Sequence, residues 1–285
     1  MYRVNRSRSL AKLKDRLGDS FAIDVAINQL LTKRRSLDVL EVGFGYGHTL
    51  LELAWLFRDK KVRFHGVDKR PNVESREDLR RIAVDFALIP PSEIAGFKLP
   101  VIHAYDATTL HFEDESLDFI YSAFVVRFIE RKDKFLEAIC RVLKPGGGAV
   151  IHIGGANWNY SYGPTIDGRR LTDLMNRFVL KYRDELIPLP AYLELFEGAT
   201  FRFDFAESSH CILVISKLAS GSLRLCLDYD KLLSMPGRTL PLVSRKGVKK
   251  GGFRSVYELR DEYYAQLSDR GLLTAEPVKQ TARHR

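Results

Sequence analysis

Three glycines at alternate positions, Gly43, Gly45 and Gly47, constrain the fold of this chain more than any other feature. They follow an apolar run over residues 37–42, which predicts a buried strand, and they precede the apolar periodicity of a helix that begins near His48. A glycine-rich turn between a strand and a helix lets backbone N–H groups approach a ligand, because no Cβ atom stands in the way. In an open parallel sheet, this turn lies in the crevice at the carboxyl ends of the strands. The turn therefore predicts a ligand site there.

Strands and helices are predicted to alternate along the rest of the chain. Further strands are expected at residues 62–67, 99–104, 117–121 and 148–153, and helices at residues 77–88, 132–143 and 171–182. A closing pair of strands is expected at residues 201–205 and 211–218. Alternation of this kind implies parallel strands with right-handed crossovers. The expected fold is α/β, a Rossmann-like sheet of seven mostly parallel strands with helices on both faces.

The positive charge of the chain is concentrated in its two ends. The net charge is +9, but residues 36–230 contain more acidic than basic side chains. We therefore expect three parts: a basic helical arm over residues 1–35, a ligand-binding domain over 36–218, and a basic, partly disordered extension over 219–285. A break near Gly18 is expected to divide the arm into two short helices. Basic flanks can recruit nucleic acid, anionic lipid or an acidic protein, or simply keep a protein soluble.

The composition favours a cytoplasmic protein. No apolar run approaches the roughly 18 residues that span a bilayer, so no membrane insertion is expected. The basic N-terminus is not followed by the apolar segment of a secretory signal. The three cysteines are scattered and form no C-x-x-C pair, which indicates reduced thiols and no metal site.

Two acids at strand ends indicate the kind of cofactor. The glycine spacing differs from the G-x-G-x-x-G of dinucleotide folds, and Asp68 can accept from the ribose diol of any nucleoside cofactor. After the next strand, the Asp106 carboxylate and the Ala107 amide supply one acceptor and one donor, which match the N6 amino group and N1 of adenine. The alternative is that Asp106 only caps a turn.

Four blocks of the chain, in the same order, resemble the class I S-adenosylmethionine-dependent methyltransferase superfamily, in its small-molecule, UbiE-like branch. The blocks are LEVGFGYG (40–47), GVD (66–68), YDATTLHFEDESLDFIYSAF (105–124) and CRVLKPGGGAVI (140–151). The resemblance covers about residues 37–218. It implies S-adenosylmethionine as the cofactor and methyl transfer as the reaction.

The resemblance also implies which residues bind the cofactor. These are Glu41, Gly43, Gly45, Gly47, Asp68, Asp106, Ala107 and Ser122. The glycines would line the methionyl part and Glu41 would lie near its amino group. Asp68 would accept from the ribose hydroxyls, while Asp106 and Ala107 would contact the adenine. Ser122 would border the sulfonium.

The residues that act on the methyl acceptor are less defined. Arg127 stands where this branch often has a histidine, so the identity of a general base stays open; the candidates are Arg127, His152, Tyr160 and Tyr162. A base is needed only when the nucleophile carries a proton, and His152 can equally be a packed histidine. The substrate is expected to contact Phe124, Asn157, Trp158 and Tyr160, although this aromatic loop can instead pack back on the sheet.

The leading hypothesis is therefore methyl transfer to a small organic acceptor at an O, N or C nucleophile. One alternative is an RNA or protein methyltransferase that uses the basic flanks, but no Asn/Asp-Pro-Pro-Tyr/Phe motif follows the fourth strand. A second is a non-catalytic module that binds the cofactor and acts through a partner. A dehydrogenase with a nicotinamide cofactor is a remote third.

Overall fold

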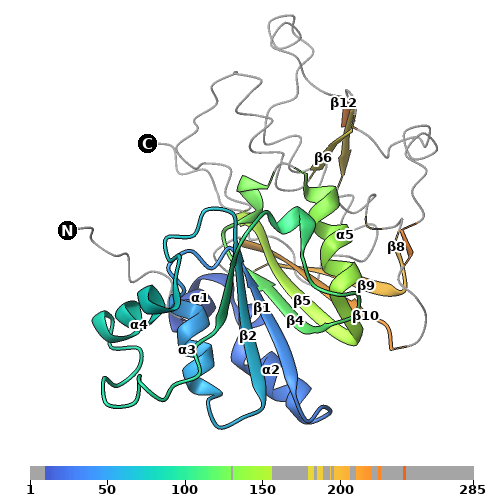
Figure 1. The fold of residues 1–285 in the computed structure, drawn as a ribbon. Coiled ribbons are helices and arrows are strands. Elements are labelled where there is room, and N and C mark those ends of the chain that lie inside the picture. Colours follow the sequence, from blue (N-terminus) through green and yellow to red (C-terminus); the bar gives the residue numbers. More distant parts are fainter. Residues whose placement is uncertain are drawn as a thin grey trace, which may run out of the picture.

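Figure 1 shows the computed structural model of the chain. It describes residues 10–129, 131–155, 179–182, 185–188, 193, 196–205, 210–219, 224–225 and 240–241.

A seven-stranded sheet forms the centre of the fold, in the order β3-β2-β1-β4-β5-β10-β9 (Figure 1). Its strands are β1 (Leu37–Val42), β2 (Val62–Asp68), β3 (Val101–Ala104), β4 (Leu117–Ser122), β5 (Leu143–Gly155), β9 (Ala199–Phe205) and β10 (His210–Lys217). The first five strands pair in parallel, and β10 runs antiparallel to both β5 and β9. The predicted α/β fold with a mostly parallel, seven-stranded sheet is confirmed.

Helices cover both faces of this sheet, with α3 and α4 on one side and α5 on the other (Figure 1). The helices are α1 (Leu10–Leu17), α2 (Ile23–Leu31), α3 (His48–Leu56), α4 (Arg76–Asp85) and α5 (Lys132–Val142), with short 3-10 turns η2 (Asp19–Phe21), η3 (Ala107–Thr109) and η4 (Val126–Phe128). The predicted break lies at Gly18, whose φ of 78° ends α1. A capping box between Ser75 and Asp78 begins α4.

The described part of the N-terminal arm is packed into the core. Five of its apolar side chains are at most 2 % exposed: Leu13, Leu17, Phe21, Ile23 and Ile27. They share one hydrophobic cluster with Leu50 and Leu53 of α3 and with Leu79 of α4. Because burial of apolar surface is the main stabilising contribution in a fold, residues 10–31 add to the stability of the sheet domain.

One expected helix is wrong at its C-terminal end. Val179–Tyr182 forms strand β6, which pairs antiparallel with β7 (Glu185–Pro188) and, through it, with β12 (Leu240–Pro241). A short apolar run fits a helix and a strand equally well, and the hairpin with β7 decides between them. The strands β8 (Phe196–Glu197) and β11 (Arg224–Leu225) form another small sheet.

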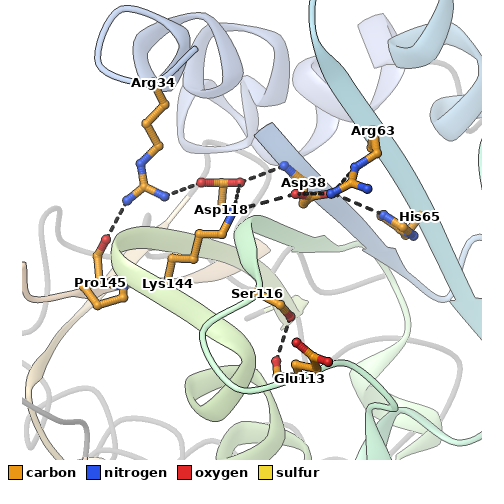
Figure 2. Close-up of polar contacts among 9 residues, drawn as sticks. All are labelled: Arg34, Asp38, Arg63, His65, Glu113, Ser116, Asp118, Lys144 and Pro145. Carbon is orange, nitrogen blue, oxygen red and sulfur yellow. Dashed lines mark hydrogen bonds and ion pairs between the residues drawn. The ribbon is translucent and has the colours of Figure 1, made fainter. Parts of the chain in front are cut away.

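A charged cluster links the amino-terminal ends of the parallel strands, opposite the ends at which the glycine turn lies. Figure 2 shows its polar contacts. Asp118 of β4 is 1 % exposed, and its carboxylate accepts from the Arg34 guanidinium, from Lys144 Nζ at 2.8 Å and from the Asp38 N–H at 2.7 Å. Arg34 also donates to the Pro145 carbonyl at 2.5 Å. The Lys-Pro-Gly-Gly part of the fourth resemblance block therefore joins β5 to β4 and to the N-terminal helices.

Asp38 of β1 extends this cluster toward β2. Burial opposes its ionisation, but hydrogen bonds from His65 and Arg63 and the charges of Arg63 and Lys144 outweigh burial and lower the pKa of Asp38 to about 2. Arg63 Nε lies 2.7 Å from the carboxylate (Figure 2). Asp38 is thus ionised at neutral pH, and the cluster spans β2, β1, β4 and the beginning of β5.

Candidate functional site

The three glycines form a turn with a left-handed backbone at the carboxyl end of β1. The φ angles of Gly43, Gly45 and Gly47 are 78°, 57° and 74°, a region that side-chain-bearing residues rarely adopt. Gly43 donates its N–H to the Val67 carbonyl at 2.6 Å, and Gly47 is the N-cap of α3. The turn therefore ties β1 to β2 and leads from β1 into α3.

Gly43 also packs closely against Val125, three residues after the end of β4. A Cβ atom on Gly43 would lie 2.0 Å from Val125 Cγ2, inside any allowed contact. We expect Gly43→Ala to lower the free energy of unfolding by about 2–4 kcal/mol, since a positive φ and overpacking each cost about 1–3 kcal/mol. Chemical denaturation measures this change.

Gly96→Ala is the matched control, because a Cβ atom there meets nothing within 4 Å. Adding Val125→Ala to Gly43→Ala should recover part of the stability, because it removes the two methyl carbons nearest to the new Cβ. If Gly43→Ala and Gly96→Ala unfold at the same denaturant concentration, the close packing of this turn is refuted.

Asp68 ends β2 beside the glycine turn. Its Oδ2 accepts from the Gly45 N–H and its Oδ1 from the Arg70 N–H, each at 3.0 Å. An ionised carboxylate has about four acceptor positions, so two positions remain for a diol. The predicted ribose contact needs such acceptor positions, and two backbone donors already orient the carboxylate.

Asp106 lies at the end of β3 and both caps a turn and pairs with a lysine. Its Oδ1 accepts from the Thr108 N–H at 2.9 Å, and its Oδ2 accepts from Lys69 Nζ at 2.8 Å. The hydrogen bonds from Lys69 and Thr108 lower the pKa of Asp106, so the group is an ionised acceptor. The Lys69 side chain is 68 % exposed, and separating so exposed a pair costs at most about 1 kcal/mol. Asp106 therefore caps the turn, as the alternative proposed. Its Oδ2 atom can also accept from the adenine N6 amino group once Lys69 moves away.

Ala107 begins η3 and is buried. Among the residues that the structure describes, its amide has no hydrogen-bond acceptor. An acceptor at Asp106 and an amide donor at Ala107 therefore stand side by side, as the adenine hypothesis requires.

Glu41 is buried near the end of β1 and accepts a hydrogen bond from Tyr121, a residue that no sequence motif indicated. Tyr121, directly opposite Glu41 in the β1–β4 register, donates its hydroxyl to Glu41 Oε2 at 3.0 Å. Complete burial and the charge of Glu41 raise the pKa of Tyr121 well above its usual value, so the phenol stays a neutral donor. The signal in the sequence is weak: a phenol at the end of the short aromatic and aliphatic run over residues 119–121. The pair places a carboxyl group near the end of β1, next to the glycine turn.

Residues at and just after the end of β4 contact β1, β5 and the N-terminal helix α1. The Ser122 hydroxyl is buried and donates to the Val42 carbonyl at 3.1 Å. Phe124 has a φ of 61°, and its N–H donates to His152 Nδ1 of β5 at 3.1 Å. The Arg16 guanidinium lies 4.7 Å from the Phe124 ring centre, a contact that no sequence motif indicated. Since Nδ1 of His152 accepts a backbone N–H, this atom holds the turn rather than facing a substrate.

Several predicted site residues lie outside the described part of the chain. They are Asn157, Trp158, Tyr160 and Tyr162; for Arg127, the backbone is described in η4 but the side chain is not. Their roles stay predictions. The structure places the predicted cofactor residues of β1, β2, β3 and β4 together, at or next to the carboxyl ends of these strands.

The described residues fit S-adenosylmethionine. Residues 43–47 contain no basic side chain, in keeping with a cofactor that lacks phosphate. The Glu41 carboxylate suits the amino group of the cofactor, Asp68 suits its ribose, and Asp106 with Ala107 suits its adenine. In the described ranges, no group of three or more His, Cys, Asp or Glu side chains is arranged to hold a metal ion. None of the described helices is long and apolar enough to span a membrane.

Comparisons with known proteins find similarity to methyltransferases. Residues 40–151 match a family model described as "Methyltransferase domain". The chain is 28 % identical over 126 residues to sterol 4-C-methyltransferase strm-1 of Caenorhabditis elegans, which is 44 % of this chain and 34 % of that protein. It is 45 % identical over 56 residues to the ubiquinone/menaquinone biosynthesis C-methyltransferase UbiE of Laribacter hongkongensis, which is 20 % of this chain and 22 % of the relative.

These two relatives are matched over only about a third and a fifth of their own lengths. Among solved structures, a SAM dependent methyltransferase from Aquifex aeolicus is 17 % identical with a TM-score of 0.42, over 75 % of this chain and 94 % of that one.

Proposed function

This chain belongs to the class I S-adenosylmethionine-dependent methyltransferase superfamily, and we propose that it transfers the methyl group of that cofactor to a small organic acceptor. The observation that carries the proposal is the convergence of four strand ends on one edge. There the turn of Gly43 to Gly47, Asp68, and the pair of Asp106 and Ala107 present groups for each part of the cofactor.

The bound cofactor supplies a methyl group made electrophilic by a sulfonium. The residues of the chain hold and orient the reactants. Asp68 accepts from the ribose, and Glu41, which accepts from the neutral Tyr121 hydroxyl, binds the amino group. Orientation of a nucleophile against the methyl carbon can account for about 7–11 kcal/mol of the barrier.

The turn at Phe124 borders the site of the methyl acceptor. His152 of β5 holds this turn by accepting the Phe124 N–H. Phe124 and the aromatic segment that includes Trp158 and Tyr160 would contact an organic acceptor. The names of the two relatives describe methyl transfer to carbon. A carbon nucleophile on an apolar, ring-bearing acceptor is therefore the form of the proposal to test first.

The proposal is tested by incubating the protein with S-adenosylmethionine and fractionated metabolite extracts. S-adenosylhomocysteine should form, and one metabolite should gain a methyl group, as detected by mass spectrometry. Asp68→Asn should lower the yield, whereas Asp85→Asn on the exposed side of α4 should not. Product formation only with RNA or protein fractions would contradict a small acceptor. No S-adenosylhomocysteine with any fraction, despite measurable cofactor binding, would support the non-catalytic alternative.

A further inference from the structure

A cavity of about 910 Å³ lies at the amino-terminal ends of β1, β2 and β3, whereas the glycine turn lies at the carboxyl ends of the strands. Its walls come from the C-terminal end of α3, the beginning of β2 at Val62, and the loop that leads into β3 at Val101. The seven residues of β2 run from this cavity to Asp68, a distance of about 20 Å at 3.3 Å per residue. The cavity is therefore separate from the candidate cofactor site. Its size is within the range of small-ligand pockets, about 300–1,000 Å³.

The charged lining of the cavity is mainly basic. It consists of five basic and two acidic side chains: Arg58, Lys60, Lys61, Arg63, Lys98, Asp59 and Glu93. Both arginines have acidic neighbours, because Arg58 lies 3.8 Å from Asp59 and Arg63 lies 2.7 Å from Asp38. In the described ranges, no hydrogen bond or ion pair involves the amino groups of the three lysines. Three lysines thus line one pocket with a single remaining acidic residue, Glu93, and all four residues are exposed.

Aromatic side chains form the apolar part of the walls. Trp55 and Phe97 contact each other edge to face at 5.6 Å between ring centres, and Arg58 lies over the Trp55 ring at 4.2 Å. Low-dielectric walls around like charges strengthen the local positive potential. Like charges that face each other without partners also repel, and a multivalent anion would remove that repulsion. Lysine ammonium groups bind phosphate well as point charges.

We propose that this cavity binds a small ligand with two or more phosphoryl groups, as found in nucleoside di- and triphosphates and in inorganic polyphosphate. Lys60 and Lys61, in the turn between α3 and β2, and Lys98, before β3, contact the phosphoryl oxygens. Glu93 opposes the ligand and limits its affinity. The volume of about 910 Å³ suits a small ligand.

Calorimetry on the full chain tests the proposal, with inorganic tripolyphosphate and ATP as separate probes in phosphate-free buffer. Saturating S-adenosylhomocysteine keeps the adenosine of ATP out of the cofactor site. The tripolyphosphate titration needs no occupied cofactor site, so its result does not depend on the proposed methyl transfer. We expect saturable binding of at least one probe. Tighter binding of ATP would assign a nucleotide, and equal binding would assign the phosphates alone.

Variants of the lining residues make the test specific. The triple variant Lys60→Gln/Lys61→Gln/Lys98→Gln should bind at least tenfold more weakly, and Glu93→Gln should bind more tightly. Lys12→Gln/Lys14→Gln/Lys33→Gln is the matched control, because it removes the same charge from exposed positions outside the cavity. Without ligand, the lining triple should melt at a temperature no lower than the wild type, since it removes repulsion.

Three outcomes would overturn the proposal. These are no saturable binding of either probe, equal losses in the lining triple and the control triple, and weaker binding in Glu93→Gln. An RNA oligomer that binds far more tightly than both probes, and loses its affinity in the lining triple, would replace the small ligand with a nucleic acid.

Discussion

Replacing Asp118 by alanine is expected to lower the free energy of unfolding by about 3–5 kcal/mol. The carboxylate is 1 % exposed and serves three donors from β1, β5 and the end of the N-terminal helices. Its removal leaves Arg34 and Lys144 with part of their charge uncompensated, and leaves the partly buried backbone N–H of Asp38 without this acceptor. Urea denaturation followed by circular dichroism measures the loss.

Asp114→Ala is the matched control for this prediction. Asp114 also pairs with an arginine, since its Oδ1 lies 2.6 Å from Arg141 Nη1, but its side chain is 73 % exposed. An exposed ion pair contributes about 0–1 kcal/mol, so this variant should stay within about 1 kcal/mol of the wild type. Equal losses in the two variants would show that the buried cluster does not fasten the strands.

Replacing Asp68 by asparagine is expected to weaken the binding of S-adenosylhomocysteine on the order of 100-fold. Two ribose hydroxyls would donate to this carboxylate, and hydrogen bonds to a charged group are worth about 1.5–3 kcal/mol each. Asparagine keeps one oxygen for the Gly45 N–H, so the turn should survive while the ribose loses an acceptor. A loss of about 2–3 kcal/mol corresponds to this change in Kd.

The binding change is measured by calorimetry, with unfolding curves to show that the variant folds. Asp85→Asn, an exposed acid in α4, is the control and should leave Kd unchanged. An Asp68→Asn protein that is folded and binds as tightly as the wild type would remove the ribose contact from the account.

The sheet and the glycine turn were predictable because local sequence determines them. Alternating strands and helices are visible in apolar periodicity, and the positive φ angles of the turn need glycine at Gly43, Gly45 and Gly47. Asp68 and Asp106 were predictable for a related reason. The carboxyl ends of adjacent parallel strands meet at one edge, so acids that follow β2 and β3 lie near each other.

Contacts between distant segments were not predictable from periodicity. Tyr121 donates to Glu41 only because of the register between β1 and β4. In the same way, the Phe124 N–H donates to His152 because of the register between β4 and β5. Nothing local indicates that Arg16 would reach Phe124. The expected helix that includes Val179–Tyr182 failed for the same reason, because pairing with a neighbouring strand overrides a weak local preference.

The most direct test of the account is a crystal structure of the chain with S-adenosylhomocysteine. We predict the adenine beside the Asp106 carboxylate and the Ala107 amide, with Lys69 displaced from Asp106. Both ribose hydroxyls should lie on Asp68, and the amino-acid part should extend over the glycine turn toward Glu41. A ligand bound elsewhere on the chain, or bound at this edge without contact to either carboxylate, would contradict the account.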